Sequence, residues 1–194
     1  MKNPNIKKMA TIALLIAMII VLQFIGSMIP PIGGMFSISL VLIPVVIGAA
    51  LYGPSAGAVL GAAFGVIVAI NCATGADPGG QLVFQSNAIL CIFVVMLKGI
   101  LAGMCAGAVY KLLCKFNGYA AMLCAAILCP VVNTGVFLLC MNVFFKDVLT
   151  VWADGKDIFL YMLSGIVLCN FVPELIINVV FSPAGQRILQ IVKK

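Results

Sequence analysis

Residues 9–29 read MATIALLIAMIIVLQFIGSMI, an apolar run without a charged side chain. A helix that crosses a bilayer needs about 20 such residues, so this run is long enough for one crossing. It follows Lys2, Lys7 and Lys8, as the apolar part of a secretory signal does, but it is too long for a signal and no A-x-A-like cleavage site follows it. We therefore predict a transmembrane helix that remains in the protein.

The composition extends this prediction to the whole chain. Of its 194 residues, 64% are hydrophobic and 8% are charged, whereas an average soluble domain carries about 25% charged residues. So few charges cannot wet the surface of a soluble globule, and the solvent of most of the chain must be lipid. The net charge of +6 does not indicate nucleic-acid binding, because the basic residues are scattered and mostly flank apolar runs.

We predict an all-α membrane protein, a single domain over residues 1–194 with six transmembrane helices. The predicted spans cover about residues 9–29, 37–52 and 56–70, a fourth within the apolar stretch 84–114, and then 119–143 and 158–181. Residues 71–85 are predicted to form a surface loop, because residues 74–80 (TGADPGG) are rich in glycine and proline. The residues before about Ile92 are predicted to be a re-entrant or surface piece, and Pro183 is predicted to end the last helix before a basic tail.

The distribution of charge predicts that both termini are cytoplasmic. The inner face would then hold only basic residues: Lys2, Lys7, Lys8, Lys111, Lys115, Arg187, Lys193 and Lys194. The outer face would hold the acidic loop residues together with two lysines: Asp77, Asp147, Asp154, Asp157, Lys146 and Lys156. An excess of Lys and Arg in cytoplasmic loops is the usual determinant of orientation.

Small residues recur at four-residue spacing in three spans. Two of these rows consist of glycine: Gly57, Gly61 and Gly65, and Gly99, Gly103 and Gly107. Such a row lets another backbone approach closely, either a partner protein or a neighbouring helix of the same bundle. In the first span, Ala13 and Ala17 form an A-x-x-x-A pattern on an otherwise evenly apolar helix, which suits a surface that slides against another membrane protein.

Polar residues inside the predicted spans are concentrated in the C-terminal half. An ionised group in hydrocarbon is costly unless it is paired or hydrated, so Lys98 and Glu174 either form an internal ion pair or line a water-filled cavity that holds a ligand. Asn170, Glu174 and Asn178 share one helical face, and Asn133 lies in the fifth span. Such a stripe can join helices or line a pocket. We therefore divide the domain into a docking half, about residues 9–70, and a binding half, about residues 88–182.

The predicted outer loops contribute two aromatic candidates. Phe36 ends a short apolar loop, and Trp152, the only tryptophan, lies in the loop 146–157. A tryptophan near a membrane boundary is usually an interfacial anchor, and stacking on a ligand is the alternative.

Several chemistries have no motif in this chain. It has no G-x-x-x-x-G-K-[ST] phosphate loop and no G-x-S-x-G or H-E-x-x-H motif, so we expect no ATP hydrolysis or other catalysis by the chain itself. It contains no histidine, and its eight cysteines form no C-x-x-C pair. We therefore expect no metal or cofactor, and we interpret the cysteines as small apolar core residues.

The layout and three motifs resemble one known family. These motifs are the turn IGAALYGPSAG at residues 47–57, the A-x-x-x-A of Ala13 and Ala17, and Lys98-Gly99. With about 190 residues and six predicted spans, the chain is similar over nearly its whole length to the substrate-binding components of energy-coupling-factor (ECF) transporters.

The resemblance implies a protein of the bacterial plasma membrane that captures a water-soluble vitamin or related micronutrient. It implies docking on a module made of a scaffold transmembrane protein and two cytoplasmic ATPases, with Ala13 and Ala17 at positions that match the docking motif. In the family the pocket lies near the outer face, between spans four to six and the outer loops.

For the binding site itself we expect contributions from six side chains: Lys98, Asn133, Asn170, Glu174, Phe36 and Trp152. Lys98 favours an anionic substrate, which ranks pantothenate or a folate-like acid above a cation such as thiamin. The alternative is a stand-alone secondary transporter or channel that acts as a homo-oligomer, motivated by the glycine rows and the charges within the spans.

Overall fold

The computed structural model describes residues 4–28, 40–155 and 157–193. Its elements are α1 (Pro4–Met28), α2 (Leu42–Tyr52), α3 (Pro54–Thr74), α4 (Pro78–Ser86), α5 (Ala88–Leu113), α6 (Gly118–Phe144), α7 (Lys146–Ala153), α8 (Ile158–Tyr161), the π-helix η1 (Met162–Phe171) and α9 (Val172–Lys193). All of these elements are helical, so the predicted all-α class is confirmed for the described residues.

Within the described residues, five helices are long and apolar enough to cross a membrane: Asn5–Met28, Pro54–Thr74, Ala88–Leu113, Gly118–Phe144 and Ile158–Val192. The last of these combines α8, η1 and α9. The apolar helix α2 has 11 residues, a length of about 16 Å, which is about half of a bilayer's hydrocarbon thickness. Residues 37–39 of the predicted second span lie outside the described residues, and six complete spans therefore remain a prediction.

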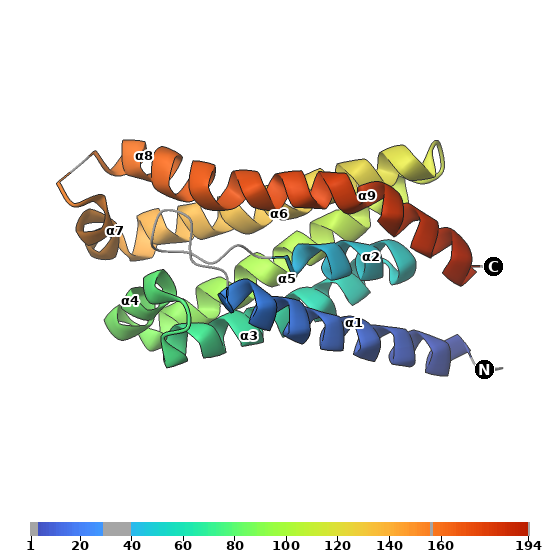
Figure 1. The fold of residues 1–194 in the computed structure, drawn as a ribbon, viewed down its shortest axis with the longest axis horizontal. Coiled ribbons are helices and arrows are strands. Elements are labelled where there is room, and N and C mark those ends of the chain that lie inside the picture. Colours follow the sequence, from blue (N-terminus) through green and yellow to red (C-terminus); the bar gives the residue numbers. More distant parts are fainter. Residues whose placement is uncertain (1–3, 29–39, 156, 194) are drawn as a thin grey trace.

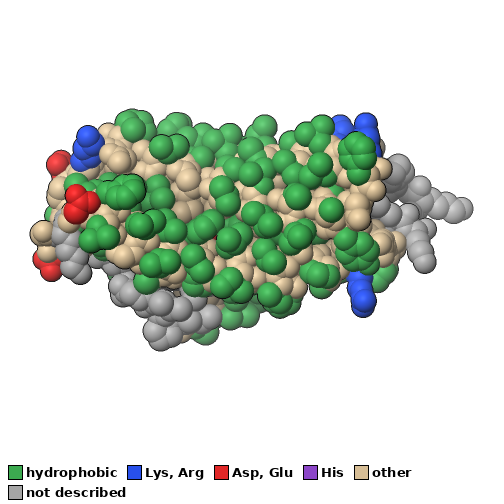
Figure 2. All heavy atoms as spheres, turned by 90° about the horizontal axis from the view of Figure 1, so that it is seen from above, with side chains coloured by type: hydrophobic (Ala, Val, Ile, Leu, Met, Phe, Trp, Pro, Cys, Tyr) green, Lys and Arg blue, Asp and Glu red, His purple; other side chains and the backbone are tan. Residues whose placement is uncertain are grey.

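The two chain ends lie at the same end of the helix bundle (Figure 1). There the Lys7 ammonium donates to the carbonyl oxygen of Val192 at 2.8 Å, and Lys8 Nζ lies 5.9 Å from the centre of the Tyr52 ring. The helices α4 and α7 contact each other at the opposite end, where Figure 2 shows acidic side chains beyond a wide apolar surface. The bundle is thus polar at its ends and apolar between them, although the side of the membrane on which each end lies remains a prediction.

The two glycine rows pack against each other inside the chain. A Cβ on Gly57 would overlap the carbonyl oxygen of Gly103, and one on Gly61 would overlap that of Gly99. Gly65 continues the seam, because its Cβ would lie 2.9 Å from the Val95 carbonyl oxygen. Of the two interpretations of these rows, packing within the bundle is therefore correct, and the α3–α5 seam does not remain available to a partner protein.

The predicted loop 71–85 is mostly helical, which corrects that prediction. The helix α3 extends to Thr74 and α4 begins at Pro78. Proline is tolerated in the first turn of a helix because the N–H that it lacks would have no intrahelical partner there. Asn87 separates α4 from α5, and its Oδ1 accepts a hydrogen bond from the Leu90 N–H at 3.1 Å. The predicted surface piece before Ile92 thus corresponds to α4, while α5 already begins at Ala88.

The prediction that Pro183 ends the last helix is wrong, because α9 continues through it to Lys193. A proline inside a helix leaves the carbonyl four residues earlier without its usual donor. Here that carbonyl belongs to Val179, and the Ser182 hydroxyl donates to it at 2.8 Å. The adjacent serine thus satisfies the freed carbonyl within the apolar bundle, as side-chain hydroxyls do in other membrane helices.

Ten residues of the last span form the π-helix η1. Its wider turns bring residues five apart together, as the Cys169 thiol shows by donating to the Ser164 carbonyl oxygen at 3.4 Å. Such segments occur frequently at functional sites. Phe171 ends η1, directly after the predicted site residue Asn170.

Candidate functional site

A cavity of about 40 Å³ lies between α3, the beginning of α4, α5, α6 and the end of η1. It is in the half of the bundle that is capped by α4. Its wall contains seven side chains with nitrogen, oxygen or sulfur atoms: Cys72, Asp77, Cys91, Lys98, Asn133, Thr134 and Asn170. Three of the six predicted site residues, Lys98, Asn133 and Asn170, are thus brought together from three separate elements.

Lys98 supplies the positive charge of the cavity wall. Its Nζ lies 4.8 Å from the centre of the Phe137 ring and 5.9 Å from that of Phe64. A cation over an aromatic face is attracted by the negative potential of the ring, and this attraction is stronger where water is excluded. The aromatic rings therefore help to hold an ammonium group at this depth in the bundle without neutralising it.

Asp77 supplies a negative charge in the same wall, which the sequence analysis did not assign to the site. Burial raises the pKa of its carboxyl above the ordinary value, while the Lys98 ammonium and the backbone amides of Gly80 and Gly79 lower it. Asp77 precedes α4, in the turn between α3 and α4. The signal in the sequence was this acidic residue in a glycine- and proline-rich turn, which we interpreted only as an outer-face charge.

Asn133 and Asn170, two of the predicted site residues, line the cavity, and each has a side-chain oxygen that could accept a further hydrogen bond. Asn133 is 5% exposed, and the Oδ1 atoms of Asn133 and Asn170 have no hydrogen-bond partner within the described chain. A buried acceptor that is left unpaired costs about 1–3 kcal/mol. Amides in this state are well placed to hold a ligand that carries hydrogen-bond donors.

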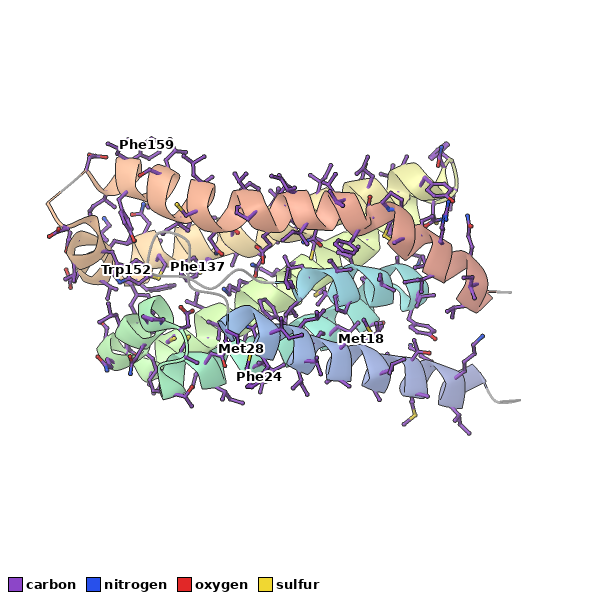
Figure 3. The ribbon with its side chains drawn as sticks, in the orientation of Figure 1. Met18, Phe24, Met28, Phe137, Trp152 and Phe159 are labelled. Atoms are coloured by element: carbon purple, nitrogen blue, oxygen red, sulfur yellow. The ribbon has the colours of Figure 1, made fainter. Side chains whose placement is uncertain are left out.

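Phe137 and Thr134 complete the wall that α6 contributes, and sequence reasoning missed both. They lie four residues and one residue after Asn133, so Phe137 shares the helical face of that asparagine. This four-residue spacing could have identified Phe137 as a candidate site residue from the sequence. Figure 3 shows Phe137 and Trp152 toward the same end of the bundle.

Two thiols also line the cavity. Cys72 of α3 and Cys91 of α5 are each 1% exposed, and a hydrogen bond joins them. Gly80 allows α4 to approach them, because a Cβ there would overlap the Cys72 sulfur. The interpretation of all eight cysteines as core residues is wrong for Cys114 and Cys124, which lie on the bundle surface.

Glu174 is placed outside the cavity wall. It is 1% exposed on α9, one step further along the stripe that begins at Asn170. Asn178 Nδ2 donates to the Glu174 backbone carbonyl at 2.8 Å, and the buried stripe continues through Ser182 to Gln186. The Tyr110 hydroxyl donates to Gln186 Oε1 at 3.2 Å. The stripe therefore divides into one cavity residue, Asn170, and a longer part that packs within the bundle.

Trp152, an aromatic candidate from a predicted outer loop, does not line the cavity either. Trp152 is 3% exposed within α7, so its ring is buried in the protein and is not an interfacial anchor at the bundle surface. Phe36 lies outside the described residues.

Ala13 and Ala17 do not line the cavity, and both are exposed on the surface of α1. Their helix exposes large apolar side chains as well, among them Met18, Phe24 and Met28, which Figure 3 labels. This surface is available to lipid or to a partner helix.

The family described as "ECF transporter, substrate-specific component" matches residues 7–184. No curated protein matches the chain.

Proposed function

Because the chain belongs to the family of substrate-specific components of ECF transporters, we propose that the cavity beside Lys98 holds its substrate, a small water-soluble vitamin or related micronutrient. Membership of the family makes the chain a multi-pass membrane subunit for transport and implies association with an ECF module.

One observation carries the proposal. Lys98, Asn133 and Asn170 belong to α5, α6 and η1, yet all three line the same cavity. Charged and amide groups inside a membrane bundle are costly, and they are typically found where they bind a substrate or an ion. A convergence of polar side chains from several helices is the usual construction of a small-molecule site.

Lys98 gives the site its preference for an anionic group on the substrate. A carboxylate or phosphate beside the ammonium would form charge-assisted hydrogen bonds in a site with little water. The Phe137 ring next to Lys98 offers an apolar face for the body of the molecule. Pantothenate or a folate-like acid fits this preference better than a cation.

The cavity must widen for such a ligand. Pockets that hold drug-sized molecules usually measure about 300–1,000 Å³, whereas this cavity measures about 40 Å³. The short helix α4 and the turn before it form one wall through Asp77, Gly80 and Val83. We propose that this wall separates from α5 and α6 when the substrate enters from outside the cell.

The exposed face of α1 with Ala13 and Ala17 is the proposed docking surface for the scaffold protein of the module. This assignment fits the proposed division of the chain, but α3 contributes to both halves, because Val68 and Cys72 line the cavity. The alternative, a homo-oligomeric transporter or channel, loses the glycine rows as support, since they pack within one chain.

The test is purification of the tagged protein with its partners from a bacterial cell membrane. We expect a transmembrane scaffold and two ATPases to co-purify, and vitamin uptake to depend on ATP. Uptake by the lone protein in liposomes, driven by a proton or sodium gradient, would overturn the proposal. Mass spectrometry of the molecule that remains bound after gentle purification then identifies the substrate.

A further inference from the structure

The cavity wall carries one basic and one acidic side chain. This pair favours a ligand that has more than an anionic group alone. Lys98 is positive and Asp77 is negative when ionised, and they are the only Lys, Arg, Asp or Glu residues in the described cavity wall. The Lys98 ammonium lowers the pKa of Asp77, so the two charges lie close enough to interact. A purely anionic ligand would gain attraction from Lys98 and suffer repulsion from Asp77.

Three oxygen atoms of the wall also require hydrogen-bond donors. Asp77 Oδ1, Asn133 Oδ1 and Asn170 Oδ1 have no hydrogen-bond partner within the described chain. They come from the turn before α4, from α6 and from η1. Because all three are acceptors, they cannot satisfy one another. Asn133 is also more than nine-tenths buried, so bulk water does not readily satisfy it.

We propose that the site selects an amphoteric ligand, one that carries an anionic group for Lys98 and at least one N–H donor group for the acceptors of Asp77, Asn133 and Asn170. This inference rests on the proposed function and specifies the substrate class of the same cavity. An anion without donors leaves three buried acceptors unpaired, whereas an amphoteric ligand satisfies acceptors and cation together. A site built for such a partner rejects analogues that lack the matching polar group.

Two matched series of small molecules test the inference on the purified full-length protein. The flat series is 4-aminobenzoate, benzoate and aniline, and the flexible series is 5-aminopentanoate, pentanoate and pentylamine. Dissociation constants are measured by calorimetry and checked by thermal shift, since a ligand that binds the folded state raises the melting temperature. We expect the amphoteric member to bind at least about tenfold tighter than both of its relatives in at least one series, as one added hydrogen bond to a charged group predicts.

Substitutions at Asn133 link the preference to this cavity. Asn133→Leu removes an unpaired acceptor, so we expect the protein to fold at least as stably and to lose the preference for the amphoteric ligand. Asn133→Gln keeps a neutral amide acceptor and is expected to retain the preference. If the simple anion binds as tightly as the amphoteric member in both series, or if no compound binds, the inference is overturned. The proposed function is tested separately, by co-purification of the ATPases and by ATP-dependent uptake, because neither experiment uses these compounds.

Discussion

Gly61 of α3 and Gly99 of α5 face each other so closely that a Cβ on either residue would overlap the carbonyl oxygen of the other. The two helix backbones are therefore in direct contact, which is possible only where side chains are absent. The same two helices carry Cys72 and Cys91 to the cavity wall. The glycine seam thus sets the distance between two walls of the candidate site.

A side chain introduced into this seam should destabilise the bundle. Gly61→Ala places a Cβ against backbone, which cannot move aside as a flexible side chain can, so we expect a loss of at least about 1–3 kcal/mol. Gly135→Ala is the matched control, because a Cβ at Gly135 would meet no atom within 4 Å, and it should be neutral or slightly stabilising. Thermal unfolding in detergent measures both. If the two substitutions change the stability equally, the close packing of α3 against α5 at Gly61 is contradicted.

The docking face can be separated from the ligand site by one bulky substitution. Ala17→Trp on the exposed face of α1 should spare ligand binding and block uptake, because the large ring prevents close approach of a partner helix. Leu139→Trp, at an exposed position of α6, serves as the control and should leave both unchanged. Binding to purified protein and uptake by whole cells are the two measurements. A parallel loss of binding and uptake in Ala17→Trp would contradict the docking role.

Removal of the charge at position 98 should weaken the ligand. Lys98→Met keeps much of the length of the side chain and deletes the ammonium, so we expect the dissociation constant of an anionic or amphoteric ligand to rise about 10- to 100-fold. Lys98→Arg keeps the charge and should lose less. Unchanged affinity accompanied by lower thermal stability would show instead that Lys98 acts only within the fold.

A bound ligand should protect the two cavity thiols from small alkylating reagents. Cys72 and Cys91 line the cavity, whereas Cys114 lies on the surface of the bundle beyond the end of α5. Peptide mass spectrometry after alkylation is expected to show slower labelling of Cys72 and Cys91 when ligand is present, with Cys114 unaffected. If the ligand leaves the labelling rates of Cys72 and Cys91 unchanged, the binding site lies elsewhere.

The stability of the protein should respond to pH through Asp77. Burial raises the pKa of this carboxyl in the folded state, so the folded protein takes up a proton there at a higher pH than the unfolded chain does. The stability that this provides is fully present below the unfolded pKa and is lost as pH rises through the folded pKa. Asp77→Asn should therefore raise the melting temperature at pH 7–8 and have little effect at about pH 3. A difference that is independent of pH would exclude this cause.

The sequence predicted a structural feature correctly where that feature depends only on the local segment. Hydropathy identified the long apolar helices, because a span depends on its own length and composition. The wrong helix boundaries fell at Pro78 and Pro183, where position within the helix decides whether proline is tolerated. At Pro183 a hydroxyl one residue away compensates for the lost hydrogen bond, a contact that propensity does not predict.

The sequence by itself determined that this chain lies in lipid, that its helices carry small-residue faces and that Lys98, Asn133 and Asn170 are polar residues within its predicted spans. Only the tertiary structure decided that the glycine rows pair with each other, that Asp77 and Phe137 join Lys98, and that Glu174 lies apart from the cavity. The reason is that residue type and periodicity assign a side chain to a face of its own helix. The rotation and register of the packed helices decide which faces meet.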